Sequence, residues 1–472
     1  MTQPAPGGTV SATRRQVRIG ALCAAALLVF AACGGDDDDD VAAAGAPNDA
    51  TDETDAPAAD ATGDEPAVEE TSAVTNEWAL TYTGGTEGPA DESLEPVVIG
   101  YVNQEGGVPA FPEATIGLEA AVSYVNTELG GTGGHPVEIV ECIVQAEEDG
   151  QRCATEMLNN DDIAFVMTGV MVVGNGSFYS TLSGKKPVIV GFPAVPDDFI
   201  AADAYAFTPG AVGVVKGMST FVGEYLDDVE SVAVVHADNA SGQASVDLFL
   251  KPGLEAQGIT DVKAVAVPDT ATAPDVAAAI QAAGGDTADL FVPLLTVQGC
   301  AATYDALQSL GVQPKVLTTG LCYGTPMTSH LADLGLDDPV PDGWYFGDLG
   351  YSYFIPDDES GMSTYLSKIA EYGPADAEYT GYAGPLFANL LTSVKLVNQV
   401  GADAVTSESM RTAAAGFTGP MMLVAGPMRC GFDAVFKSLC GTQMGVQQYA
   451  DGSWTSIANA LNGQAIETAP AS

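Results

Sequence analysis

The alternation of short apolar runs with longer helical segments constrains the fold of this chain more than any other feature of its sequence. The apolar runs have the length and the Val and Ile content of buried strands. The expected strands are Val97–Val102, Val137–Ile143, Ile163–Thr168, Pro187–Val190, Ser231–His236, Val262–Val267, Asp289–Leu294 and Lys315–Thr319. They come as two successive groups of four, which indicates two sheets.

Segments of helical periodicity lie between these runs. The expected helices are Glu113–Glu128, Gln151–Leu158, Gly176–Ser183, Val212–Leu226, Ser241–Ala256, Ala273–Ala283, Ala301–Leu310 and, after Trp344, Met362–Tyr372 and Tyr382–Val400. Apolar strands that alternate with helices predict parallel sheets covered by helices. The expected fold class is therefore α/β, with two doubly wound parallel-sheet lobes. The stretch Phe417–Tyr449 departs from this pattern because it is rich in Gly and Pro.

The first strand–loop–helix unit, Val97–Asn126, is the clearest example of the pattern. A Gly-containing loop, Asn103–Val108, follows the strand, and Pro109, Pro112 and Glu113 mark the start of the helix. Ligands of open α/β sheets bind at the carboxyl ends of such strands. A ligand site is therefore expected near this loop, although the first unit of any α/β domain has the same form.

The balance of charges excludes some classes of partner. The chain has 472 residues, with 63 acidic side chains against 15 Lys and Arg, and a net charge of −48. Nucleic acids and anionic membrane surfaces bind basic surfaces, so neither is an expected partner. The acidity does not by itself predict a cationic ligand, since solvation or adaptation to salt explains it equally well.

Residues 1–33 have the pattern of a targeting segment. Basic residues, Arg14, Arg15 and Arg18, precede the apolar run Ile19–Ala32, which is too short to span a bilayer comfortably. The run ends in Phe-Ala-Ala-Cys-Gly, which resembles a bacterial lipobox with Cys33 as the lipidated residue. An ordinary signal peptide is the alternative.

Residues 34–95 form an acidic stretch. Between Asp36 and Glu95 there are 19 Asp and Glu and no Lys or Arg. Such a composition cannot bury a core, so the whole stretch is expected to be a disordered, extended tether.

Six cysteines remain after the targeting segment. Six cysteines allow fifteen connectivities, and the simplest joins sequence neighbours as Cys142–Cys153, Cys300–Cys322 and Cys430–Cys440. A metal site is the rival interpretation. It is disfavoured because the sequence has no CxxC motif and its three histidines are scattered. No metal or cofactor is expected.

Several stretches, taken in order, resemble one known family. They are VVIGYVNQEGG from residue 97, GLEAAVSYVNTELGGTGGHPVEIVECIVQAEEDGQRCATEMLN from 117, VMTGVMVVGNGSFYSTLSGKKPVIVGFP from 166, SVAVVHADNASGQASVDLFLKPGLEAQGI from 231 and FTGPMMLVAGPMRCGFDA from 417. Together they are similar to type I periplasmic binding proteins. More narrowly, they resemble the Leu/Ile/Val-binding, receptor ligand-binding region family of ABC importer substrate-binding lipoproteins. The resemblance covers about Pro96 to Ile457.

This resemblance implies two lobes joined by a three-segment hinge, near Phe207–Gly210, Phe346–Tyr351 and Phe417–Ala425. The implied division is 96–209 with 350–418 for the N-terminal lobe, 210–349 with 419–457 for the C-terminal lobe, and 458–472 for a tail. A ligand would bind in the cleft, and the lobes would close on it.

The resemblance also implies which loops contact the ligand. In the first lobe the candidates are Gln104, Glu105, Met171, Val172, Val173, Phe192, Pro193 and Ala194. In the second lobe they are His236, Asn239, Ser241, Gln298 and Tyr323. For Glu105 a solvated loop carboxylate is the alternative, and for His236 a hydrogen-bonded residue at a strand end.

Two departures from amino-acid binders of this family are evident. Their first-lobe loops supply small hydroxyl residues for an α-carboxylate, but here no hydroxyl occurs before Ser177. The acid that would neutralise an α-ammonium group is absent around Leu321–Tyr323. The cleft is therefore expected to be less charged and more apolar than that of a branched-chain amino-acid binder.

The expected function is capture of a small amino-acid-like or apolar organic ligand for an ABC permease. The protein would be a monomer outside the cytoplasm, anchored through Cys33 to the outer face of the membrane. A sensing or adhesion lipoprotein on the same fold is the alternative. Enzyme activity is not expected, since the sequence has no GxSxG, HExxH, Walker or GxGxxG motif.

Overall fold

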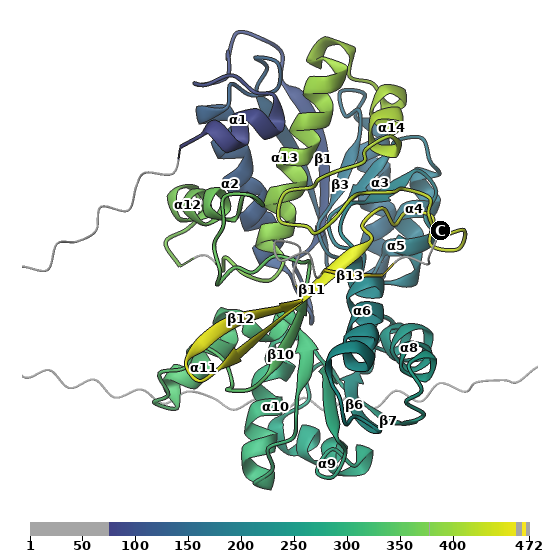
Figure 1. Cartoon of the computed structure of the whole chain (residues 1–472). Helices are drawn as coiled ribbons and strands as arrows, with labels where there is room; N and C mark the ends of the chain where they lie inside the picture. The colour runs from purple at the N-terminus through teal and green to yellow at the C-terminus, as the bar shows by residue number, and fades with distance from the viewer. Residues whose placement is uncertain (1–74, 377, 459–464, 469–472) are drawn as a thin grey trace, which may run out of the picture. The chain divides into compact units, whose positions relative to one another are not determined.

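The computed structural model describes residues 75–376, 378–458 and 465–468, which belong to one compact unit, Thr71–Ser472. The expectations for the targeting segment 1–33, for Cys33 and for residues 34–74 lie outside the described residues. The same holds for residues 459–464 and 469–472 of the expected tail. Figure 1 shows the described elements with the labels used below.

The first sheet consists of five parallel strands in the order β2-β1-β3-β4-β5. They are β1 Val97–Gln104, β2 Val137–Val144, β3 Val166–Thr168, β4 Val188–Val190 and β5 Ala204–Ala206. The central strands β3 and β4 are buried at every residue, whereas the edge strand β2 alternates buried and exposed residues. Continuous apolar runs are typical of strands covered by helices on both faces. The burial of β3 and β4 therefore explains why both strands could be predicted from the sequence.

Eight helices and one short 3₁₀ turn accompany this sheet in the described chain. They are α1 Glu77–Thr83, α2 Pro112–Glu128, α3 Glu147–Asn159, α4 Asn175–Leu182, α5 Pro196–Ile200, α12 Met362–Tyr372, α13 Ala383–Val400, η3 Ala402–Ala404 and α14 Ser407–Ala415. Helix α13 packs along α2 (Figure 1). A Cβ atom on Gly117 would lie 2.1 Å from the Ala383 carbonyl oxygen. Only glycine therefore allows the two backbones to approach so closely.

The second part of the fold contains parallel and antiparallel strands. Strands β6 Ser231–Ala237, β7 Asp261–Val267 and β8 Leu290–Leu294 form a parallel sheet in the order β7-β6-β8. A bridge from Phe291 to Val316 leads on to β9 Leu317–Thr319, which pairs in parallel with β10 Tyr345–Asp348. Strands β11 Gln443–Ala450 and β12 Ser453–Ala458 then pair antiparallel (Figure 1), and β13 Ile466–Glu467 pairs with β11.

The expected α/β fold with parallel-sheet lobes is confirmed, with these antiparallel strands as an addition. The sequence analysis predicted no strand for Tyr345–Asp348 or after Gln443. The helices around this part are α6 Gly210–Tyr225, α7 Ala240–Ala244, η1 Ser245–Leu250, α8 Lys251–Ala256, α9 Ala273–Ala283, α10 Val297–Leu310, η2 Gly320–Tyr323 and α11 Thr325–Asp333.

The expected helix Ser241–Ala256 is interrupted in the structure. Its middle section, Ser245–Leu250, has π-helical hydrogen bonding and lies between α7 and α8. Pro252 follows this section. Since proline has no N–H to donate, Pro252 cannot form the ordinary i→i−4 hydrogen bond to the Leu248 carbonyl, and the regular α-helical bonding is interrupted here.

The expectation of disorder up to Glu95 was wrong for the described residues 75–95. Tyr82 is 8% exposed, and its hydroxyl lies 2.8 Å from Thr392 Oγ1 of α13. The Trp78 indole N–H donates to the Glu359 carbonyl, and the Thr86 N–H donates to the Leu129 carbonyl. Within this acid-rich segment, apolar and aromatic residues form a cluster that packs on the helices of the first sheet. The folded region therefore begins before Pro96.

Chain segments pair at two places near the expected hinge. The Ala206 N–H donates to the Ser438 carbonyl, and the Cys440 N–H donates back to the Ala206 carbonyl. The Ala425 N–H donates to the Leu349 carbonyl. The last bond joins two of the expected hinge segments, whereas the first two join Ala206, which directly precedes the other segment, to Ser438 and Cys440, which the sequence analysis did not place at the hinge. The lobe boundaries remain predictions.

Within the described residues, no helix combines the length and the apolar character required to cross a membrane.

Candidate functional site

A cavity of about 470 Å³ lies where loops from both sheets meet. Its lining comes mainly from residues just after β1, β3, β4, β6, β8, β9 and β10, with further residues from α6 and the segment before α13. These are the carboxyl ends of parallel strands, where ligands of open α/β sheets bind. The volume is within the range of small-molecule sites.

Seven of the thirteen residues expected to contact a ligand line this cavity. They are Val172, Phe192, Ala194, Asn239, Ser241, Gln298 and Tyr323. The structure therefore brings predicted residues of both lobes to one cavity. None of these contacts is tested with a ligand, so their roles remain predictions.

The other six candidates lie outside the lining. Three of them, Gln104, Glu105 and Val173, form hydrogen bonds within the first lobe. The Gln104 side chain donates to the Pro109 carbonyl at 2.7 Å and accepts the N–H groups of Val172 and Val173 at 2.8 and 3.3 Å. The Glu105 carboxylate accepts from Asn103 Nδ2 and from the Thr115 hydroxyl. The Gln104 side chain therefore positions backbone groups, and the Glu105 carboxylate binds two side chains of its own lobe.

The remaining three candidates, Met171, Pro193 and His236, are buried. Met171 is 2% exposed and belongs to the core, and Pro193 is buried against the start of α6. His236 is 4% exposed, and its Nδ1 lies 3.0 Å from the Ala237 carbonyl. The alternative interpretation of His236, a hydrogen-bonded residue at a strand end, fits this geometry.

Aromatic side chains form one wall of the cavity. The rings of Phe111 and Tyr382 meet edge to face, with centroids 5.4 Å apart. The ring of Phe192 lies 5.0 Å from that of Tyr382. Because these rings come from the loops before α2 and after β4 and from the residue preceding α13, the wall depends on the packing of α2 against α13.

Four carboxyl groups that the sequence analysis did not place at the site line the cavity, whereas the expectation of a cleft less charged and more apolar than that of a branched-chain amino-acid binder stays a prediction. They are Glu113, Asp348, Asp376 and Glu378, and the lining contains no Lys, Arg or His among the residues described. Glu113 was noticed in the sequence only as a helix-start acid. Glu378 lies in a segment with no strand or helix pattern, so no sequence signal placed it near the loops after β9.

Burial changes the acidity of two of these carboxyl groups. Burial raises the pKa of Glu113 to about 7, and the nearby charges of Glu378 and Glu105 add to the effect. Burial also raises the pKa of Asp348 to about 6, although hydrogen bonds from the Tyr323 hydroxyl and the Leu349 N–H oppose it. Neither carboxyl group forms an ion pair with a basic side chain of the described chain.

Two hydrogen bonds connect the loops of the two sheets around the cavity. The Ser241 hydroxyl, after β6, donates to the carbonyl of Ala194, after β4, at 2.8 Å. The N–H of Thr325, after β9, donates to Glu378 Oε2 at 2.7 Å. Glu378 also accepts from the Thr380 N–H. Polar groups of both halves of the fold are thus in contact at the site.

All three sequence-local disulfides are present: Cys142–Cys153, Cys300–Cys322 and Cys430–Cys440. Cys300 and Cys322 are fully buried and follow the lining residues Gln298 and Leu321 closely in the chain. This bond therefore joins two loops of the cavity. The described residues contain no cluster of His, Cys, Asp and Glu suited to a metal ion.

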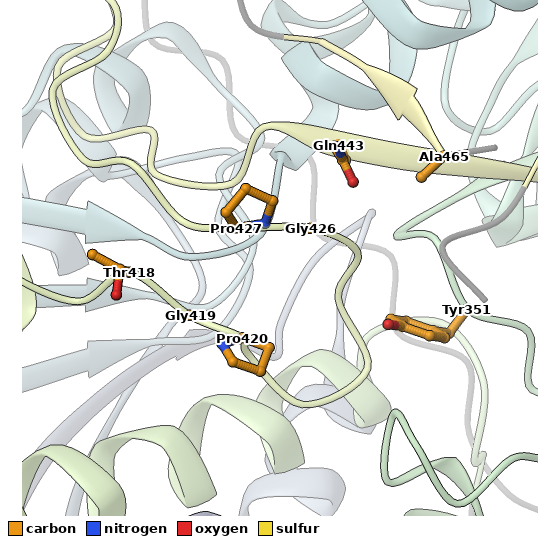
Figure 2. Close-up of a pocket in the computed structure, with 8 residues that line it drawn as sticks. All are labelled: Tyr351, Thr418, Gly419, Pro420, Gly426, Pro427, Gln443 and Ala465. Atoms are coloured by element: carbon orange, nitrogen blue, oxygen red, sulfur yellow. The ribbon is translucent and has the colours of Figure 1, made fainter. Parts of the chain in front are cut away.

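A second cavity of about 440 Å³ has a different lining (Figure 2). It lies near the expected hinge segment, and its walls are Tyr351, Thr418, Gly419, Pro420, Gly426, Pro427, Gln443 and Ala465. Among the described residues, its lining has no charged side chain and none of the strand ends of the two parallel sheets. The first cavity is therefore the candidate ligand site.

Comparisons with solved structures show the same fold in bacterial binding proteins. A leucine-binding protein from Thermotoga maritima aligns with a TM-score of 0.61 at 14% identity, covering 79% of this chain and 99% of that one. A branched-chain amino acid ABC transporter protein from Thermus thermophilus with bound valine aligns with a TM-score of 0.62 at 13% identity, over 78% and 97%.

A third structure is an ABC transporter solute-binding protein from R. palustris in complex with 4-hydroxybenzoate. It aligns with a TM-score of 0.62 at 16% identity, covering 80% of this chain and 98% of that one. No curated protein matches the chain. The family model described as periplasmic binding protein matches residues 96–439, which is most of the folded part. The chain therefore belongs to the periplasmic binding protein family, whose members act outside the cytoplasm as solute-binding components of transport systems.

Proposed function

We propose that this protein is the substrate-binding lipoprotein of an ABC importer and captures a small organic ligand in the 470 Å³ cavity. The observation that carries the proposal is the lining itself, which draws apolar, aromatic and polar side chains from the strand ends of both sheets. Solved neighbours include proteins described as binding valine, benzoate and 4-hydroxybenzoate. An amino-acid-like or apolar organic ligand is consistent with this range.

Ligand binding would couple to closure of the two lobes about the hinge. A ligand shifts such an equilibrium only as far as it prefers the closed form. The bonds from Ser241 to Ala194 and from Thr325 to Glu378 are the kind of contact that depends on how the loops of the two sheets approach each other. The ABC permease would recognise the closed, monomeric protein.

A ligand screen on the full-length chain tests this proposal. Thermal unfolding would be measured with amino acids, amines, amides, aliphatic and aromatic acids, and sugars. A ligand at about 100 times its dissociation constant adds about 2.7 kcal/mol of stability, so we expect a clear rise in melting temperature with one chemical class. Mass spectrometry should recover the ligand unchanged. Failure of every class, with no ligand co-purified, would contradict a solute-binding role; turnover of the ligand would contradict a role without catalysis.

The lipid anchor has a test with a matched control. Replacing Cys33 with serine is expected to release the protein from the membrane fraction, because only a cysteine thiol can carry the lipid. Cys23→Ser changes the other cysteine of the same apolar segment and should leave the protein in the membrane fraction. Fractionation and immunoblotting would measure both. Membrane association that survives Cys33→Ser but not Cys23→Ser would move the anchor to Cys23.

A further inference from the structure

We propose that the cavity selects an organic cation: an amine or ammonium group carried on an apolar or aromatic body. This inference rests on the proposed solute-binding function and specifies the ligand class. It is narrower than the amino-acid-like or apolar organic ligand expected from the sequence, since it requires a cationic group and no carboxylate. Three independent features of the lining support it.

The first feature is uncompensated negative charge. Glu113, Asp348, Asp376 and Glu378 line the cavity, and no lining residue among those described is basic. The charge of Glu378 is close enough to disfavour the ionised form of Glu113. A cation would offset this repulsion, whereas a carboxylate ligand would add to it.

The second feature is the shortage of free donors in the first-lobe loops. A bound carboxylate requires hydrogen-bond donors, because a buried charge without them is strongly disfavoured. After β3, the N–H groups of Val172 and Val173 already donate to Gln104 Oε1. After β4, those of Ala194 and Val195 donate to Asp198 Oδ2 at 2.9 and 3.2 Å. These loops are therefore poorly prepared to bind an α-carboxylate.

The third feature is the aromatic wall next to the acids. Cations bind favourably over the faces of aromatic rings. The wall of Phe111, Phe192 and Tyr382 lies beside Glu113, whose charge acts on the Tyr382 hydroxyl. An aromatic or aliphatic body can pack on this wall while its cationic group points to the carboxyl groups.

Glu113 is the acid whose contribution is easiest to isolate. Its pKa of about 7 arises from burial and from Glu378 and Glu105, and the hydroxyls of Tyr101 and Tyr382 also lie within its electrostatic reach. A cation binds the ionised carboxylate more tightly than the neutral acid. Affinity for a cation should therefore rise as the pH increases through about 7 and fall as the pH decreases below it.

The experiment compares four probes that share one aromatic body. They are phenethylamine as the cation, 2-phenylethanol as the neutral probe, phenylalanine as the zwitterion and phenylacetate as the anion. Calorimetry on the full-length protein at pH 8 and about 0.15 M salt, where exposed charges are screened over about 8 Å, should rank phenethylamine first. Its affinity should fall several-fold between pH 8 and pH 6, while that of 2-phenylethanol should not change.

Glu113→Gln provides the variant and Glu119→Gln its matched control. Both remove one negative charge from α2, but Glu119 is exposed and does not line the cavity. We expect Glu113→Gln to weaken phenethylamine binding at pH 8 about tenfold or more and to reduce its pH dependence to the part that Asp348, with a pKa of about 6, contributes, with 2-phenylethanol unaffected. Glu119→Gln should leave both probes unchanged.

Three outcomes would overturn the inference. Tighter binding of phenylacetate or phenylalanine than of phenethylamine would refute the ligand class and leave the solute-binding function intact. Equal losses in Glu113→Gln and Glu119→Gln would show that phenethylamine responds only to the general surface charge. Absence of binding by all four probes, together with a response to an acid or a sugar in the wider screen, would also refute the ligand class. If that screen fails as well, the solute-binding function fails with it.

Discussion

Replacing Asp198 with alanine is expected to lower the free energy of unfolding by about 4 kcal/mol, because its carboxyl group is a buried acceptor for several donors. Asp198 is 2% exposed. Its Oδ1 accepts from Asn175 Nδ2 at 2.7 Å and from the Tyr179 hydroxyl at 3.0 Å. Its Oδ2 accepts the N–H groups of Ala194 and Val195. Alanine would leave all four donors buried without this partner.

The loss should extend from stability to binding. Asp198 lies in α5, just after the loop that follows β4. Two residues of that loop, Phe192 and Ala194, line the cavity. Without the carboxyl group this loop loses two backbone hydrogen bonds, so ligand affinity is expected to fall as well. Urea denaturation would measure the stability, and calorimetry would measure the affinity.

The effect of Asp198 should also depend on pH. Burial raises its pKa from 3.8 to about 6 in the folded protein, while the hydrogen bonds oppose this rise. A carboxyl group whose pKa is raised by folding contributes stability at low pH, and this contribution is lost as the pH rises through the folded pKa. The gap between wild type and Asp198→Ala should therefore be wider at pH 4 than at pH 8.

Asp198→Asn is the control for shape, because it keeps the size of the side chain and one oxygen acceptor. We expect it to cost about half as much as alanine and to remove the pH dependence. If alanine were tolerated within about 1 kcal/mol, the hydrogen-bond network around Asp198 would not be what holds the loop after β4.

Most strands of the two parallel sheets could be predicted because burial on both faces makes their sequences continuously apolar. Thus β1 and β6 begin at the expected residues, Val97 and Ser231. The strand β5 was missed because its sequence, Ala-Tyr-Ala, contains no Val or Ile, unlike the equally short β3 and β4. The sequence of β11, Gln443–Ala450, mixes Gln and Gly with apolar residues and therefore lacks a clear period.

The site was predictable at the level of loops and not of side chains. Ser241 and Gln298, which line the cavity, could be predicted near it because the residues that follow strand ends lie at one edge of a sheet. Gln104 was misplaced because its amide binds backbone groups of its own lobe, a local event that sequence does not record. Glu378 was missed because it reaches the cavity through a tertiary contact with Thr325.

Removing the Cys300–Cys322 disulfide by a double alanine substitution is expected to affect both stability and ligand binding. The bond closes a loop with a sequence separation of 22 residues. In the chain-entropy model, its loss costs about 3 kcal/mol. Binding should weaken about tenfold (~1.4 kcal/mol), because the bond ties the first turn of α10 to η2, and residues of both segments line the cavity.

The Cys142–Cys153 disulfide offers a matched control in the same protein. Its sequence separation of 11 residues predicts a similar cost, also about 3 kcal/mol, but it joins β2 to α3 and borders no lining residue. Thermal unfolding should therefore show comparable losses for the two double variants, whereas calorimetry should show weaker binding only without Cys300–Cys322. If both variants retained wild-type affinity, the Cys300–Cys322 bond would stabilise the fold without positioning the loops of the cavity. If both lost affinity equally, binding would respond to global stability, because the only local difference between the variants is the position of the bond relative to the cavity.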